Sequence, residues 1–141
     1  MIAVDSNLLI DFIGDDEHAA SAADSALRLA LAQGPVVACE VVVAELVAGL
    51  GNGSLVVDAL EELGIDYSPL ERRSAVRAGE MQRRYAERRR AAREPGESQR
   101  TVPDFLVGAH ALLQCQGLIT RDAGFFRDYF KGLKVIVPKG T

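Results

Sequence analysis

The chain has 141 residues, 48% of them hydrophobic, and a formal net charge of −4 at pH 7. This length and composition are typical of one folded domain with its own core, and they exclude a disordered chain, which would combine low hydrophobicity with high net charge. The net acidity is also unlike that of a typical nucleic-acid-binding protein.

Short apolar runs and longer helical patterns alternate along the chain. The predicted strands are short and cover residues 2–4, 36–38, 65–67, 118–119 and 135–137. The strand at 36–38 is continuously apolar, as buried parallel strands are. The first predicted helix begins at Ser6. The other predicted helices cover 17–33, 40–50, 54–63, 71–93, 103–114 and 123–130. Ser54 is the expected cap of the fourth helix, and a loop is expected at 94–98.

This alternation predicts the fold class. Strands separated by helices favour right-handed crossovers and a parallel sheet covered on both faces. We therefore expect one α/β domain over residues 1–141, a three-layer α/β/α sandwich with a central, mainly parallel sheet and the first strand in the middle. Ligands of such sheets bind at the carboxyl ends of the strands.

Several features favour a cytoplasmic protein with no membrane contact. No apolar run is long enough to span a bilayer, and the N-terminus has no signal-peptide pattern. Cys39 and Cys115 lie far apart in apolar segments, so we expect both to be buried and reduced. His18 and His110 do not complete a zinc site with them.

Four acidic residues stand where such a sheet would bring them together. Asp5 directly follows the first strand and Asp122 follows the fourth by two residues. Glu45 lies in the helix after the second strand, in a stretch so apolar that an exposed face is hard to find. Asp104 lies in the first turn of the helix VPDFLVGAHALL.

Four converging carboxylates need something to cancel their charge. A hard divalent cation, Mg²⁺ or Mn²⁺, fits oxygen ligands and would suit hydrolysis of a phosphodiester by an activated water. Each acid also has a simple structural interpretation. Asp5 and Asp122 can be helix caps, Asp104 can serve the helix dipole, and Glu45 can be a solvated helix residue. The positions of the four acids taken together favour a shared metal site over these separate roles.

The segments VDSNLLIDF, VVVAEL, VPDFLVGAHALL and LITRDAGFF, in that order, resemble the four acidic motifs of the PIN-domain ribonucleases, and within them the VapC-like toxins of type II toxin–antitoxin pairs. The resemblance implies that Asp5, Glu45, Asp104 and Asp122 are catalytic, and that Asp5, Asp104 and Asp122 bind Mg²⁺ or Mn²⁺. It implies an RNA substrate, a cognate antitoxin and a homodimer. It is weakest over residues 51–100.

Polar neighbours of these acids are candidates for orienting them. The Ser6 hydroxyl, the Asn7 amide and the Thr120 hydroxyl are each placed to hydrogen-bond a carboxylate, although capping and turn formation explain them too. Glu40 is either a fifth site acid or, as we favour, a first-turn acid. Asp11 is expected on the surface of its helix.

The positive charge is concentrated in one arm. Residues 71–100 hold ten arginines against five acids, a balance of +5, which leaves about −9 for the rest. Arg73, Arg77, Arg84 and Arg88 recur on one helical face, with a packing stripe of Ala75, Ala78, Met81 and Tyr85 beside it.

Three interpretations of this arm stay open: a solvated helix with internal ion pairs, an RNA-phosphate surface, or a site for an acidic antitoxin segment. Arg84 and Arg88 are the candidates for the last two. Arg121 is the predicted nearest cation to the acids and has the same two possible partners.

We expect His110, which lies on another side of its helix from Asp104, to be packed or to face a partner. The aromatic residues of 125–130 are expected in the core, and Gly108 and Ala109 should allow close packing.

Other functions account for the sequence less well. A haloacid-dehalogenase-type phosphatase requires a second Asp where Asn7 stands, and a response-receiver-like module requires an Asp after its middle strand and a late Lys. A housekeeping PIN nuclease without an antitoxin and a non-catalytic metal-binding partner module remain as alternatives.

Overall fold

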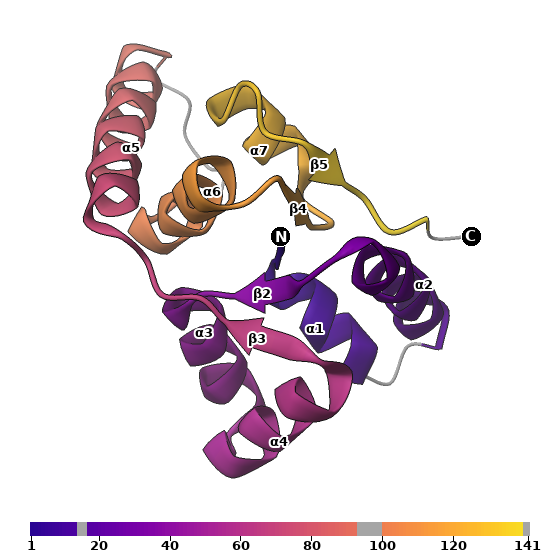
Figure 1. Ribbon diagram of the computed structural model, residues 1–141. Helices are drawn as coiled ribbons and strands as arrows, with labels where there is room; N and C mark the ends of the chain where they lie inside the picture. The colour runs from indigo at the N-terminus through magenta and orange to yellow at the C-terminus, as the bar shows by residue number, and fades with distance from the viewer. Residues whose placement is uncertain (14–16, 93–99, 140–141) are drawn as a thin grey trace.

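The computed structural model describes residues 1–13, 17–92 and 100–139 (Figure 1). Its strands are β1 (Ile2–Val4), β2 (Val36–Ala38), β3 (Ile65–Tyr67), β4 (Gly117–Ile119) and β5 (Val135–Ile136). Its helices are α1 (Ser6–Ile13), α2 (Glu17–Gln33), α3 (Glu40–Leu50), α4 (Gly53–Leu63), α5 (Arg72–Ala92), α6 (Val102–Gln114) and α7 (Ala123–Tyr129).

The five strands form one sheet in the order β3-β2-β1-β4-β5, and every neighbouring pair is parallel. The predicted α/β class, the central place of β1 and the three-layer arrangement are confirmed. In β1, Ile2 pairs with Val36 on one side and with Gly117 on the other. All three residues of β1 are buried, which explains why the strand is short and wholly apolar.

The strand order fixes which helices cover which face. The connections β1–β2 and β2–β3 run across the sheet in one direction, so the right-handed rule places α1 to α4 on one face. The connections β3–β4 and β4–β5 run back, and they place α5, α6 and α7 on the other face. Figure 1 shows these two groups on opposite sides of the sheet.

The core between the sheet and the second group of helices is aromatic. Phe105 of α6 is fully buried and contacts the rings of Tyr85, Phe125, Tyr129 and Phe130. These rings join α5, α6 and α7. The prediction that the aromatic residues of 125–130 pack in the core is confirmed for Phe125, Phe126 and Phe130, and Tyr129 is half-buried.

Some helix details differ from the sequence prediction. The cap of α4 is Asn52, whose side-chain oxygen accepts a hydrogen bond from Leu55 N at 3.0 Å, and not Ser54, which lies inside the helix. Asn52 caps because the helix begins one residue earlier than its apolar pattern does. The strand β5 ends at Ile136, one residue short of the prediction. The predicted loop 94–98 lies outside the described residues.

The packing stripe of α5 also differs in part. Ala78 and Tyr85 are buried as expected, but Ser74 completes the stripe and Ala75 is exposed. Ser74 tolerates burial because its hydroxyl donates a hydrogen bond to Gln114 Oε1 at 2.7 Å. Within the described part of the chain, no helix has the length and apolar character needed to cross a membrane.

Candidate active site at the carboxyl edge of the sheet

Asp5 stands at the end of the central strand. Its backbone N–H donates to Ile119 O at 3.0 Å, which continues the β1–β4 pairing by one residue. The side chain is buried, and Oδ1 accepts a hydrogen bond from Ser6 N at 2.8 Å. This contact resembles a helix cap, because Ser6 is the first residue of α1. Asp5 is thus fixed by two elements at once.

The other oxygen of Asp5 belongs to a network with the end of β4. Thr120 Oγ1 donates to Asp5 Oδ2 at 2.8 Å and accepts from Asp122 N at 3.0 Å. Asn7 Nδ2 lies 3.3 Å from both Asp5 Oδ2 and Thr120 Oγ1. The Asn7 Oδ1 accepts from Arg121 N at 3.3 Å. Through these bonds Asn7 and Thr120 tie the loop after β4 to Asp5.

Glu45 approaches from α3. Its Oε1 accepts a hydrogen bond from Ser6 Oγ at 3.3 Å, so Ser6 contacts Asp5 through its backbone and Glu45 through its side chain. Glu45 is exposed, contrary to the expectation that α3 lacks an exposed face. That face exists because small residues, Ala44, Ala48 and Gly49, accompany Glu45 at the surface.

Asp5 lies within electrostatic reach of the other three predicted acids. Burial raises the pKa of Asp5 above its ordinary value, and the charges of Asp104 and Asp122 add to this, while the hydrogen bonds from Thr120 and Ser6 oppose it. Although Glu45 as a whole is exposed, partial burial of its carboxyl group raises its pKa, and the charges of Asp5 and Asp104 add to this. Like charges are therefore gathered at this edge of the sheet.

Asp104 and Asp122 have partners of their own. Asp104 Oδ2 accepts a hydrogen bond from Thr101 N at 3.2 Å at the start of α6. Asp122 precedes α7, but its side chain makes no capping hydrogen bond there. It instead forms an ion pair with Arg100, which lies 22 residues earlier in the chain.

Arg100 is the cation at the site that sequence reasoning missed. Its guanidinium contacts Asp122 and lies 4.5 Å from the ring centroid of Phe125. The hydrogen bond to Asp122 raises the pKa of Arg100, so the side chain is charged. The prediction that Arg121 is the nearest cation was wrong. Arg121 turns away and pairs with Asp11 at 2.6 Å, and the carboxylate of Asp11 is largely buried rather than free on the surface.

Glu40 takes no part in this cluster. It lies in the first turn of α3, as favoured, and its Oε1 accepts a hydrogen bond from Leu70 N at 2.9 Å. It therefore holds the segment between β3 and α5.

The other residues considered from sequence are structural. His110 is buried, with Nε2 3.1 Å from Ser68 Oγ, and burial lowers its pKa. Cys39 and Cys115 are free thiols, but only Cys39 is fully buried.

Residues 2–131 match the family model described as the PIN domain. The chain belongs to the PIN-domain family. None of the curated proteins compared with this PIN domain matches it significantly.

Solved structures share its fold. One is a chain of VapBC2 from Rickettsia felis, a complex solved with a DNA fragment from its promoter. The match has a TM-score of 0.72 at 15% identity and covers 99% of this chain and 100% of that chain. A chain of a toxin–antitoxin complex from Klebsiella pneumoniae has a TM-score of 0.63 at 20% identity, with 100% of both chains covered. A chain of FitAcB from Neisseria gonorrhoeae has a TM-score of 0.61 at 23% identity, with 98% of both covered.

The PIN-domain acids lie at one edge of the sheet and fit a divalent cation by their chemistry, but their side chains are not all turned toward one point. Among residues 1–13, 17–92 and 100–139, no three His, Cys, Asp or Glu side chains lie in a group able to hold a metal as they stand. The reason is visible in their bonds, because Asp104 is turned to Thr101 and Asp122 to Arg100. The donor set is entirely oxygen, which hard ions such as Mg²⁺ and Mn²⁺ prefer, and the mutual repulsion would be relieved by such a charge.

Proposed function

We propose that this PIN domain is a Mg²⁺- or Mn²⁺-dependent endoribonuclease and the toxin of a VapBC-type toxin–antitoxin pair. The observation that carries the proposal is the convergence of Asp5, Glu45, Asp104 and Asp122 at the carboxyl edge of the sheet, where burial and the charges of neighbouring acids raise the pKa of Asp5 and of Glu45. Membership of the PIN-domain family and the fold shared with chains of toxin–antitoxin complexes support it.

In this proposal, Asp5, Asp104 and Asp122 hold the cation and Glu45 acts on the attacking water. A bound divalent ion would supply activation of that water and stabilisation of the leaving oxygen. The chain's own residues orient these acids. Thr120 and Asn7 direct the Oδ2 of Asp5, and Ser6 directs the carboxylate of Glu45.

The first experiment is cleavage of a labelled RNA by the purified protein. We expect cleavage with Mg²⁺ or Mn²⁺, none with a chelator, and none for Asp5→Asn. The matched control is Asp24→Asn, which removes a partly exposed carboxylate that pairs with Arg28 on the same helix. If Asp5→Asn cleaves as well as the wild type, the site assignment fails.

A second experiment separates a toxin from a housekeeping nuclease. We expect expression of the wild type to arrest growth, and co-expression of the product of the adjacent small gene to relieve the arrest and to co-purify as a complex. Growth arrest should need Asp5. Sedimentation of the protein alone would test the predicted homodimer.

A further inference from the structure

A second region of the surface combines positive charge with a hollow. A groove of about 350 Å³ lies between α5, α6 and α7, and its charged lining is formed by Arg77, Arg84, Arg88, Lys131 and Asp128. We call it the arginine groove. Four cations thus face one acid there, in a protein whose net charge is −4. A lining with this excess of positive charge favours the binding of an anion.

Among the described residues, the arginines that face the groove do not stabilise α5 through ion pairs with carboxylates. Arg77, Arg84 and Arg88 lie on one face of α5, three turns in all, with Met81 between them. In the residues that the structure describes, none of the three pairs with a carboxylate. By contrast, Arg83 on another face pairs with Glu87 at 3.2 Å, and Arg73 pairs with Glu71 at 3.0 Å and donates to Leu113 O at 2.9 Å.

Aromatic rings hold a row of arginines in place beside the groove. The guanidinium carbon of Arg88 lies 5.4 Å from the ring centroid of Tyr129, and that of Arg89 lies 5.6 Å from the centroid of Tyr85. The two rings contact each other edge to face at 5.4 Å. A cation fixed over a ring loses less side-chain entropy when it binds an anion than a freely rotating one does.

This row leads to the carboxylate site. A second hollow of about 470 Å³ shares Asp128 and Tyr129 with the arginine groove and is also lined by Arg89 and Arg100. Arg100 lies over Phe125, whose ring is 5.6 Å from that of Tyr129, and its guanidinium contacts Asp122. Cations therefore continue from α5 to one of the four acids.

We propose that the arginine groove binds the phosphates of the single-stranded RNA segment adjoining the cleaved bond, which Arg88, Arg89 and Arg100 guide to the carboxylates. The inference rests on the proposed function and extends it by placing the flanking strand. A strand seated at four carboxylates is repelled by them, so its affinity must come from cations outside the site. RNA is favoured over an acidic peptide because the row of cations continues through Arg100 to Asp122, at the carboxylates where the cleaved bond of an RNA substrate would lie.

The test uses the full chain with Asp5→Asn, so that RNA is bound without being cut. Binding of a fluorescein-labelled oligouridylate is followed by anisotropy at several salt concentrations. Adding Arg84→Ala and Arg88→Ala should weaken binding about tenfold and reduce the salt slope by about 1.4, the value for two phosphate contacts on a single strand.

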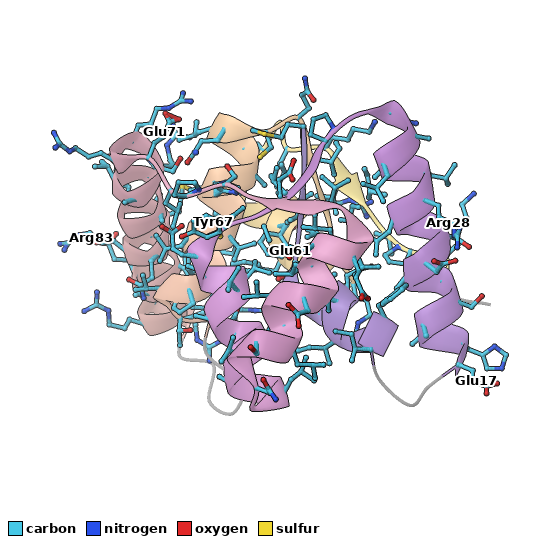
Figure 2. All side chains as sticks on the ribbon, turned by 60° about the horizontal axis from the view of Figure 1, so that its bottom comes forward. Glu17, Arg28, Glu61, Tyr67, Glu71 and Arg83 are labelled. Atoms are coloured by element: carbon cyan, nitrogen blue, oxygen red, sulfur yellow. The ribbon has the colours of Figure 1, made fainter. Side chains whose placement is uncertain are left out.

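The matched control removes the same charge from the same helix. Arg83→Ala with Arg90→Ala leaves the groove intact, and Figure 2 shows the Arg83 side chain projecting outward from α5. This pair should bind RNA as the parent does. Arg84→Lys with Arg88→Lys should recover most of the affinity, which separates lost charge from lost folding; circular dichroism of every variant checks the fold.

Three results would overturn the inference. Equal weakening by the groove pair and the control pair would mean that only total charge matters. Unchanged binding in the groove pair would remove the groove from the RNA path. A labelled polyglutamate peptide that binds as tightly as the oligouridylate, and loses affinity with it, would assign the groove to an acidic protein segment. Because these assays need no cleavage, they are independent of whether the wild type proves to be a nuclease.

Discussion

The guanidinium of Arg100 forms an ion pair with the carboxylate of Asp122, which lies 22 residues later in the chain. The protein thus places one of its own positive charges against one of the four acids. The pair is about two-thirds buried, with 31% and 33% of the two side chains exposed. In the proposed nuclease, a divalent cation and the guanidinium of Arg100 would therefore compete for the same carboxylate. This relationship gives the first prediction.

Arg100→Ala should bind Mn²⁺ more tightly than the wild type. A partly exposed ion pair contributes about 1 kcal/mol, so removing the competing charge should improve the affinity about fivefold. Isothermal titration with Mn²⁺ measures this, and Arg83→Ala is the control because Arg83 pairs with Glu87 on the surface of α5. A weaker affinity in Arg100→Ala would show that Arg100 supports the ion's site rather than competing with it.

The sequence predicted the architecture well because each element carries its own local signal. The buried triplet Ile2–Val4 and the stop at Gly34–Pro35 are local patterns, and the alternation of strands and helices specifies a parallel sheet. The meeting of Asp5 with the end of β4 follows from the same rule, since the carboxyl ends of parallel strands share one edge.

The partners of the site acids were less predictable. Arg100 meets Asp122 only through the fold, and no periodicity links positions 22 residues apart. Arg121 was chosen because it adjoins Asp122, but the two side chains have different partners. Its backbone faces Asn7 while its guanidinium reaches Asp11. Adjacency in sequence is thus a poor guide to which cation contacts an acid.

The buried carboxyl of Asp5 predicts an unusual pH dependence of stability. Its pKa is raised from 3.8 in the folded protein, so the unfolded chain ionises first and the free energy of unfolding falls as the pH rises above 3.8. Asp5→Asn has no carboxyl group at this position, so its free energy of unfolding does not fall in this way. In the presence of chelator, we expect Asp5→Asn to be more stable than the wild type at pH 7 and to lose this advantage as the pH approaches 3.8.

Urea unfolding at several pH values measures the difference. Adding Mn²⁺ at pH 7 should stabilise the wild type and leave Asp5→Asn unchanged, because a ligand of the folded state raises its stability. The stabilisation by Mn²⁺ should itself weaken as the pH falls, since protonated Asp5 does not bind a cation. Equal effects of Mn²⁺ on both proteins would place the ion elsewhere.

Thr120 provides a test of how the acids are oriented. Its hydroxyl donates to Asp5 Oδ2 and accepts from Asp122 N, so Thr120→Val removes both bonds with little change of shape. Loss of such an orienting group typically costs 10–100-fold in metal affinity or activity, and we expect about tenfold or more in cleavage rate. Thr120→Ser keeps the hydroxyl and should retain most activity. If valine and serine variants cleave equally, the hydroxyl does not orient Asp5.

Gly108 of α6 lies directly against the ring of Phe130, the residue that follows α7. A Cβ added there would lie 2.7 Å from Cδ2 of Phe130, a buried ring in the aromatic core, while a Cβ on Gly79 of α5 would meet nothing within 4 Å. Gly108→Ala should therefore lower the free energy of unfolding by about 1–3 kcal/mol through overpacking. Gly79→Ala, in an open helical position, should raise it by about 0.5–1 kcal/mol. Urea unfolding of the two variants compares them directly, and a stabilised Gly108→Ala would mean that Phe130 can move aside without cost.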